Sequence, residues 1–134
     1  MVTTDDLKEL QYLPKELQQI DFAIDQLKRP PLWSMNHTQR KDYAAAVAEL
    51  IEIYQDRRQR CAVQLEGLRR FLDGIQDDFT RDIFRLRYEC GKTWLNISND
   101  LYDRGFYYAE DTTKKMCHRY LERYNRNEAG RKDE

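Results

Sequence analysis

The chain has 134 residues, 35% of them charged and 40% hydrophobic, with only 5 glycines and 3 prolines. Because 12% of the residues are aromatic, this composition excludes a disordered chain, and it is typical of helices that keep one face in water. The net charge of −1 excludes a strongly basic protein, so any nucleic-acid surface has to be local.

The first predicted element is an amphipathic helix over residues 14–28. Pro14 suits the first position of a helix. The apolar residues that follow recur in steps of three and four, which is the spacing of a heptad seam: Leu13, Leu17, Ile20, Ile24 and Leu27. The helix cannot continue through the two prolines at 30 and 31, so residues 30–36 are expected to form a loop.

A second, much longer helix is predicted over residues 38–72, with Thr38 as its N-cap. Its apolar positions begin at Tyr43, and Arg57 and Arg58 interrupt them midway. A helix of this length needs a partner. The partner is either the first helix, in an antiparallel hairpin, or a second copy of the chain. We expect the hairpin, together with a homodimer that uses part of the same surface.

Three shorter helices are predicted after a break near Gly74, over residues 79–89, 93–102 and 110–124. The sequence contains no alternating run typical of a β-strand, so the predicted fold class is all-α. The predicted domains are a helical hairpin or coiled-coil region over 1–76, a helix-turn-helix over 77–126 and a polar tail over 127–134.

The last two helices match a helix-turn-helix, in which the second helix lies in the major groove of DNA. Residues 79–126 carry 10 basic and 7 acidic side chains, a local excess of +3. Cations on the second helix can reach base edges and phosphates, and hydroxyl or guanidinium groups at its start can hold the DNA backbone. The expected DNA-binding residues are Arg104, Tyr107, Tyr108, Asp111, Thr112, Lys114, Lys115, His118, Arg119 and Arg123. Asp111 also complements the helix dipole, which is its ordinary structural role.

Three segments of this region resemble region 4 of bacterial sigma factors: residues 81–88 (RDIFRLRY) followed by Gly91, residues 93–98 (TWLNIS), and residues 112–120 (TTKKMCHRY). They are similar to the run that leads into the sigma-factor helix-turn-helix and to its recognition helix. Trp94 and the aromatic-rich turn bring the chain closer to the small sigma-region-4-like proteins of phages and mobile elements, such as late-gene activators of the ArpU and RinA type. The resemblance is strong over 77–124 and loose before it.

The resemblance implies a phage or mobile-element transcriptional regulator that binds double-stranded promoter DNA and contacts RNA polymerase. The chain departs from the family pattern in three ways. Ser98 replaces an alanine, the turn over 102–109 is longer, and Glu110 and Asp111 place two anions where DNA approaches. Two alternatives remain open: a small terminase-like subunit for DNA packaging, and a protein-interaction module that has lost DNA binding.

No enzyme activity, cofactor or metal site is expected. The sequence has no Gly-rich phosphate loop, nucleophile motif or pair of catalytic carboxylates. Cys117 and His118 are adjacent, so they point to different faces of a helix and make a poor metal pair. The three cysteines lack disulfide spacing, and no apolar run is long enough to span a membrane. We therefore expect a cytoplasmic protein, with Trp94 in the core of its helix-turn-helix.

Overall fold

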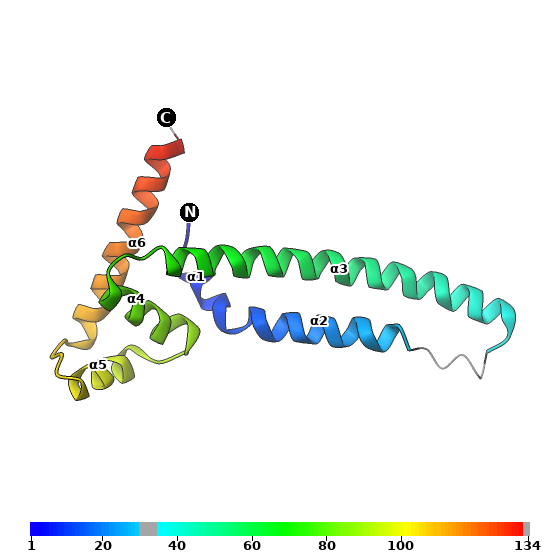
Figure 1. Cartoon of the computed structure of the whole chain (residues 1–134), viewed down its shortest axis with the longest axis horizontal. Helices are drawn as coiled ribbons and strands as arrows, with labels where there is room; N and C mark the ends of the chain where they lie inside the picture. The colour runs from blue at the N-terminus through cyan, green and yellow to red at the C-terminus, as the bar shows by residue number, and fades with distance from the viewer. Residues whose placement is uncertain (30–34, 133–134) are drawn as a thin grey trace. The chain divides into compact units, whose positions relative to one another are not determined.

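A computed structural model describes residues 1–29 and 35–132 of the chain. Every regular element in these residues is a helix, which confirms the predicted all-α class (Figure 1). The elements are α1 (Thr4–Lys8), the 3₁₀ turn η1 (Glu9–Gln11), α2 (Leu13–Leu27), α3 (His37–Asp73), α4 (Asp78–Phe84), the π-helical turn η3 (Arg85–Glu89), α5 (Trp94–Asp103) and α6 (Glu110–Lys132). The five predicted helices correspond to α2, α3, α4 with η3, α5 and α6.

The two ends of the chain contain more helix than the sequence predicts. α1 precedes the first predicted helix, and α6 continues past the predicted end at residue 124 to Lys132. The extra turns of α6 lack an apolar stripe, but they contain good helix formers such as Arg126, Glu128 and Ala129. Most of the segment expected as a polar tail is therefore helical. Residues 133–134 and most of the predicted loop, residues 30–34, lie outside the described residues.

The chain divides into two compact units. The hairpin comprises Leu13–Glu66, and the C-terminal unit comprises Gly67–Glu134 together with Met1–Tyr12. This division differs from the predicted one at residue 76, because the start of the chain and the end of α3 join the C-terminal unit. Burial gives the reason: Leu7 and Leu10 are 0% and 4% exposed within that unit.

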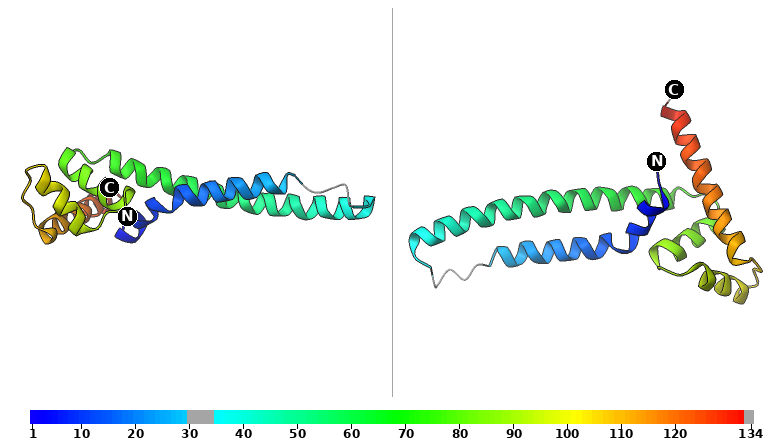
Figure 2. Two further views of the ribbon diagram at one scale, coloured as in Figure 1. Left: turned by 90° about the horizontal axis from the view of Figure 1, so that it is seen from below. Right: turned by 180° about the vertical axis from the view of Figure 1, so that it is seen from behind.

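In the hairpin, α2 and the first part of α3 run antiparallel and side by side (Figures 1 and 2). The two helices bury residues of their predicted apolar seams: Leu13, Ile20 and Ile24 of α2, and Cys61 and Leu65 of α3. Of the two arrangements left open by the sequence, the antiparallel hairpin is therefore present within a single chain.

Arg57 and Arg58 interrupt the apolar seam because they join the two helices. Arg57 Nη2 lies 2.5 Å from Glu16 Oε1, and Arg58 Nε lies 2.6 Å from Asp21 Oδ1. Adjacent residues of a helix point about 100° apart, so the two pairs flank the seam on opposite sides. Hydrogen bonds to Glu16 and to Asp21 raise the pKa of the respective guanidinium groups. Both ion pairs are exposed, so each contributes little to the free energy of unfolding. They help to determine how α2 and α3 pair.

The first turn of α3 is closed by a capping box two residues before the predicted cap, Thr38. The Gln39 backbone N–H donates to Asn36 Oδ1 at 2.8 Å, and the Asn36 backbone N–H donates to Gln39 Oε1 at 3.1 Å. These two bonds satisfy donors that the helix itself leaves without acceptors.

The core of the C-terminal unit is built around an aromatic cluster at the end of α3. The Phe71 ring meets the rings of Phe84, Tyr120 and Tyr124 edge-on, with centroid distances of 5.7, 6.2 and 4.8 Å. Such pairs contribute about 0.5–1.5 kcal/mol each beyond the area they bury. Through this cluster α3, α4 and α6 share one core.

The N-terminal segment is tied to this core at both of its ends. The Val2 backbone N–H donates to Asn125 Oδ1 at 2.9 Å, and the Asn125 amide donates to the Val2 carbonyl at 2.7 Å. At the other end, Gln11 packs against Gly91, which has a φ of +73° and where an added Cβ would lie 2.8 Å from Gln11 Oε1. Gly91 is therefore favoured by its left-handed backbone, whereas the amide end of Gln11 could move aside for an added Cβ.

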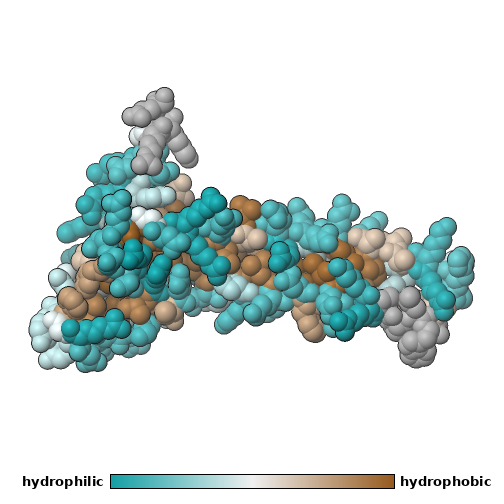
Figure 3. Space-filling view, viewed as in Figure 1, coloured by the Kyte–Doolittle hydropathy of each residue, from teal (hydrophilic) through white to brown (hydrophobic). Residues whose placement is uncertain are grey.

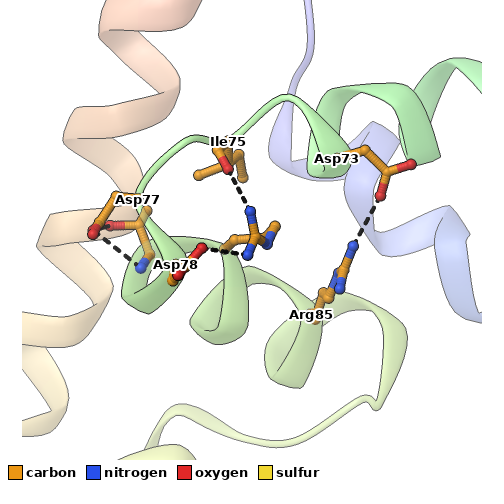
Figure 4. Close-up of polar contacts among 7 residues, drawn as sticks. Asp73, Ile75, Asp77, Asp78 and Arg85 are labelled. Carbon is orange, nitrogen blue, oxygen red and sulfur yellow. Dashed lines mark hydrogen bonds and ion pairs between the residues drawn. The ribbon is translucent and has the colours of Figure 1, made fainter.

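The connection between α3 and α4 is fixed by side-chain hydrogen bonds (Figure 4). Asp77 caps α4 by accepting from the Thr80 backbone N–H and hydroxyl, and these bonds hold the pKa of the Asp77 carboxyl below its usual range. Arg81 donates to the Ile75 carbonyl at 3.1 Å, and Arg85 Nη2 lies 2.8 Å from Asp73 Oδ1. The start of α4 is thus held against the end of α3.

Candidate nucleic-acid interface

α5, the turn over residues 104–109 and α6 form the part of the C-terminal unit that corresponds to the predicted helix-turn-helix. Gly105, with a φ of +90°, lets the chain leave α5, and the Phe106 backbone N–H donates back to the Leu101 carbonyl at 2.8 Å. The Ser98 hydroxyl donates to the Tyr108 carbonyl at 2.7 Å. Ser98, which departs from the sigma-factor pattern, therefore ties the long turn back onto α5.

The turn presents aromatic side chains in two groups. Phe79 of α4 packs against Phe106 and Tyr108, with ring centroids 5.2 and 5.5 Å apart, so Tyr108 has a structural role as well as an exposed edge. Tyr107 and Tyr102 form a separate edge-on pair at 5.0 Å, and their side chains are 75% and 64% exposed. Tyr107 is therefore available to a partner, whereas Tyr108 belongs to an aromatic cluster at the surface with Phe79 and Phe106.

The inner face of α6 is fully committed to packing. Thr113, Cys117 and Leu121 are buried, at a spacing of four residues that keeps them on one face. The Thr113 hydroxyl donates to the Ala109 carbonyl at 3.1 Å, so this buried donor has its hydrogen bond within the first turn of the helix. Burial raises the pKa of the Cys117 thiol to about 12, which keeps it protonated and excludes it as a nucleophile or metal ligand near neutral pH.

The outer face of α6 carries the predicted DNA-binding residues. Lys114, Lys115 and Arg119 are exposed, and His118 is half-buried. Asp111 and Thr112 are exposed in the first turn, where the Asp111 carboxylate complements the helix dipole. Helical spacing puts Lys115 and Arg119 near the centre of this face and Lys114 at its edge.

Two arginines near the C-terminal end of α6, Arg123 and Arg126, do not lie where the sequence predicts. Arg126 is exposed and, at eleven residues after Lys115, continues the same row. It was not among the predicted residues because the helix was expected to end at 124. Arg123 instead lines a hollow of about 590 Å³ between α4 and α6, together with Asp77, Tyr120 and Tyr124.

The cations of α6 differ from those of the scaffold in their partners. Arg57, Arg58, Arg81 and Arg85 each lie within ion-pair distance of a carboxylate, as does Lys92, which pairs with Asp100. Within the described part of the chain, none of the outer cations of α6 forms such a pair: Lys114, Lys115, Arg119, Arg123 and Arg126. Their charge is therefore free to act on an external anion, offset only by Asp111 and Glu122 on the same side.

Arg104 occupies the end of α5 rather than the face of α6. Its backbone N–H donates to the Leu101 carbonyl at 3.1 Å, and its exposed side chain borders a smaller hollow of about 240 Å³. That hollow is otherwise lined mainly by apolar side chains such as Phe79, Leu86 and Phe106. The structure thus places Arg104, Tyr107 and Tyr108 on the turn and the other predicted residues on α6, so the predicted set forms two neighbouring groups rather than one row.

The start of α5 is rigidly supported beneath this surface. Trp94 is 9% exposed, as expected for a core residue, and the Arg87 guanidinium carbon lies 5.0 Å from the centroid of its ring. Arg87 also donates to the Lys92 carbonyl at 3.0 Å, and Thr93 caps α5 by accepting from the Asn96 N–H at 3.2 Å. These contacts fix the turn that precedes α5.

In the residues that the structure describes, there is no group of three or more His, Cys, Asp or Glu side chains that could hold a metal ion. The same residues include no helix with the length and apolar character needed to cross a membrane. No family model, curated protein or solved structure matches the chain.

Proposed function

We propose that the C-terminal unit binds double-stranded DNA through the outer face of α6, and that the protein is a transcriptional regulator of the phage or mobile-element type. The observation that carries this proposal is the division of α6 into two faces. Thr113, Cys117 and Leu121 anchor the helix in the core, while the opposite side presents cations that have no acidic partner among the described residues. A recognition helix needs this combination of a fixed position and free donors.

The proposed contacts follow from the chemistry of each group. Lys115 and Arg119 lie near the centre of the exposed face, where they can reach phosphates or the O6 and N7 acceptors of guanine. Arg104 and the Tyr107 hydroxyl are on the turn, where they can donate to the DNA backbone. Asp111 and Glu122 weaken the attraction to phosphate, so we expect moderate affinity and a strong dependence on salt.

RNA polymerase and a second copy of the chain are the further partners that we propose. Exposed aromatic rings are typical of protein interfaces, and the Tyr102–Tyr107 pair with Leu95, which is 56% exposed, offers such a surface beside the DNA-binding helix. The same surface favours the second candidate function, a protein-interaction module without DNA binding. A half-buried apolar groove on the hairpin supports self-association.

The test replaces Lys115 and Arg119 together with alanine and measures binding to duplex DNA at several salt concentrations. Loss of two phosphate contacts should weaken binding by about 1–3 kcal/mol and reduce the slope of log K against log salt by about two. The matched control, Lys15→Ala with Arg69→Ala, removes the same charge from exposed sites on other helices. If both double variants lose equal affinity, the effect is one of net charge and the α6 interface is wrong.

A further inference from the structure

The hairpin has an apolar groove that α2 and α3 do not fill. It measures about 500 Å³ and lies between the end of α2 and the first turns of α3. Six of its eight lining residues are apolar: Leu27, Tyr43, Ala44, Val47, Ala48 and Ile51. Hydrophobic side chains form a band along the hairpin in Figure 3. The groove thus presents apolar surface to solvent in the half of α3 that has no buried residue between His37 and Arg60.

Three residues of this groove form a second heptad seam on α3, distinct from the one that faces α2. Ala44, Ala48 and Ile51 are spaced by four and three residues, and the two alanines are exposed while Ile51 is half-buried. Tyr43 and Val47, which also line the groove, are half-buried. Small side chains let two helix axes approach closely, so this face suits another helix rather than a small molecule.

The charges along α3 indicate which helix fits. The first turn contains no acidic residue, and Arg40 and Lys41 follow near the positive end of the helix dipole. Asp42 comes next but points about 160° away from Ala44, on the other side of the helix. Glu49 and Glu52 lie two to three turns later and are exposed. If a second α3 helix packs antiparallel to the first, its Glu49 and Glu52 lie beside the basic first turns of this helix. Because the arrangement is two-fold symmetric, the same contact forms a second time with the two copies exchanged.

We propose that a second copy of the chain occupies the groove, with the two α3 helices crossing antiparallel so that Ala44 of each copy faces Ala48 of the other. In this arrangement Lys41 of one copy approaches Glu52 of its partner. The inference rests on the self-association proposed above and is independent of DNA binding. It places the dimer contact in the hairpin and leaves the outer face of α6 unused.

The test compares Ala48→Glu with Ala46→Glu by sedimentation equilibrium of the full chain. Both sites are exposed alanines on the same helix, but Ala46 points about 160° away from Ala48. The parent and Ala46→Glu should reach twice the chain mass of 16.3 kDa at micromolar concentration. Ala48→Glu should raise the dimer dissociation constant by at least about tenfold, with unchanged helical circular dichroism.

A charge exchange tests the antiparallel register. Ala44→Glu alone and Ala48→Lys alone should each dimerise weakly, whereas an equimolar mixture should dimerise more tightly than either, because residue 44 of one copy faces residue 48 of the other. A parent that stays monomeric overturns both the proposed self-association and this interface, and assigns the groove to a different protein. A dimer that tolerates Ala48→Glu as well as Ala46→Glu overturns the interface alone.

Discussion

The hairpin and the C-terminal unit differ sharply in how much apolar surface they bury. In its described residues the hairpin buries five apolar side chains, three on α2 and two on α3. The C-terminal unit buries 14, drawn from each of its helices and from the N-terminal segment. The C-terminal unit therefore has a self-sufficient core, whereas the hairpin exposes residues such as Phe22 and Ile53 and is suited to association.

The same contrast appears in the charged residues. In the hairpin, Arg57, Arg58 and Arg60 each pair with a carboxylate of the same unit. On α6 the outer cations have no such partner in residues 1–29 and 35–132. The two regions thus differ in the apolar area that the hairpin leaves exposed and in the row of cations along one face of α6. Among the described residues, Lys15, Lys28 and Lys41 of the hairpin also lack an ion pair, but they do not form such a row. An apolar surface selects a protein partner and an uncompensated cationic face selects a polyanion, which is why we assign the two partners to different units.

The largest effect expected from this comparison is the loss of a core aromatic. Trp94→Ala should lower the free energy of unfolding by about 3–5 kcal/mol, because it removes a buried ring and the contact with Arg87. Phe22→Ala, at a hairpin position that is 67% exposed, should change it by less than about 0.5 kcal/mol. Urea denaturation followed by circular dichroism measures both. Equal losses for the two variants would contradict the difference between the units.

The next largest loss of stability is expected from a change in the N-terminal segment, residues 1–12, which belongs to the C-terminal unit. Leu7→Ala should lower the stability of the C-terminal unit by about 2–5 kcal/mol, because Leu7 is completely buried. Lys8→Ala, at the adjacent exposed position, serves as the control and should have little effect. Near-wild-type stability of Leu7→Ala would show that the first twelve residues are not part of that core.

Two glycines provide the smallest and most local test. Gly91→Ala should destabilise the protein by about 1–3 kcal/mol, because the backbone at this position is left-handed, with a φ of +73°. Gly67→Ala should instead stabilise it by about 0.5–1 kcal/mol, since Gly67 lies inside α3 with nothing within 4 Å of an added Cβ. Thermal unfolding of both variants measures the two signs. A neutral Gly91→Ala would contradict the left-handed backbone at this turn.

Much of the fold follows from the sequence because helical periodicity is a local signal. The five predicted helices could be located from the spacing of apolar residues. The partner of the first twelve residues could not, because Leu10 continues the heptad of α2, while the bonds that fix the segment join Val2 to a residue 123 positions away. Periodicity identifies a buried face but not what covers it.

The candidate interface was predicted in part for similar reasons. The division of α6 into inner and outer faces follows from its 3.6-residue repeat, which correctly separates Thr113 and Cys117 from Lys115 and Arg119. Arg126 was missed because no glycine or proline marks the helix end, and polar helix formers carry it onward. The shared role of Tyr108 depends on Phe79 and Ser98, which only the tertiary structure brings together.

The central claim, that the outer face of α6 acts on a polyanion, is tested most directly by titrating the unmodified protein with duplex DNA at 50 and 200 mM salt. Three to five phosphate contacts predict that the affinity falls roughly 40- to 500-fold between these conditions. Fluorescence anisotropy of a labelled duplex measures both affinities. Binding that is absent at the lower salt, or that does not change between the two, would contradict the account and favour a protein-interaction module.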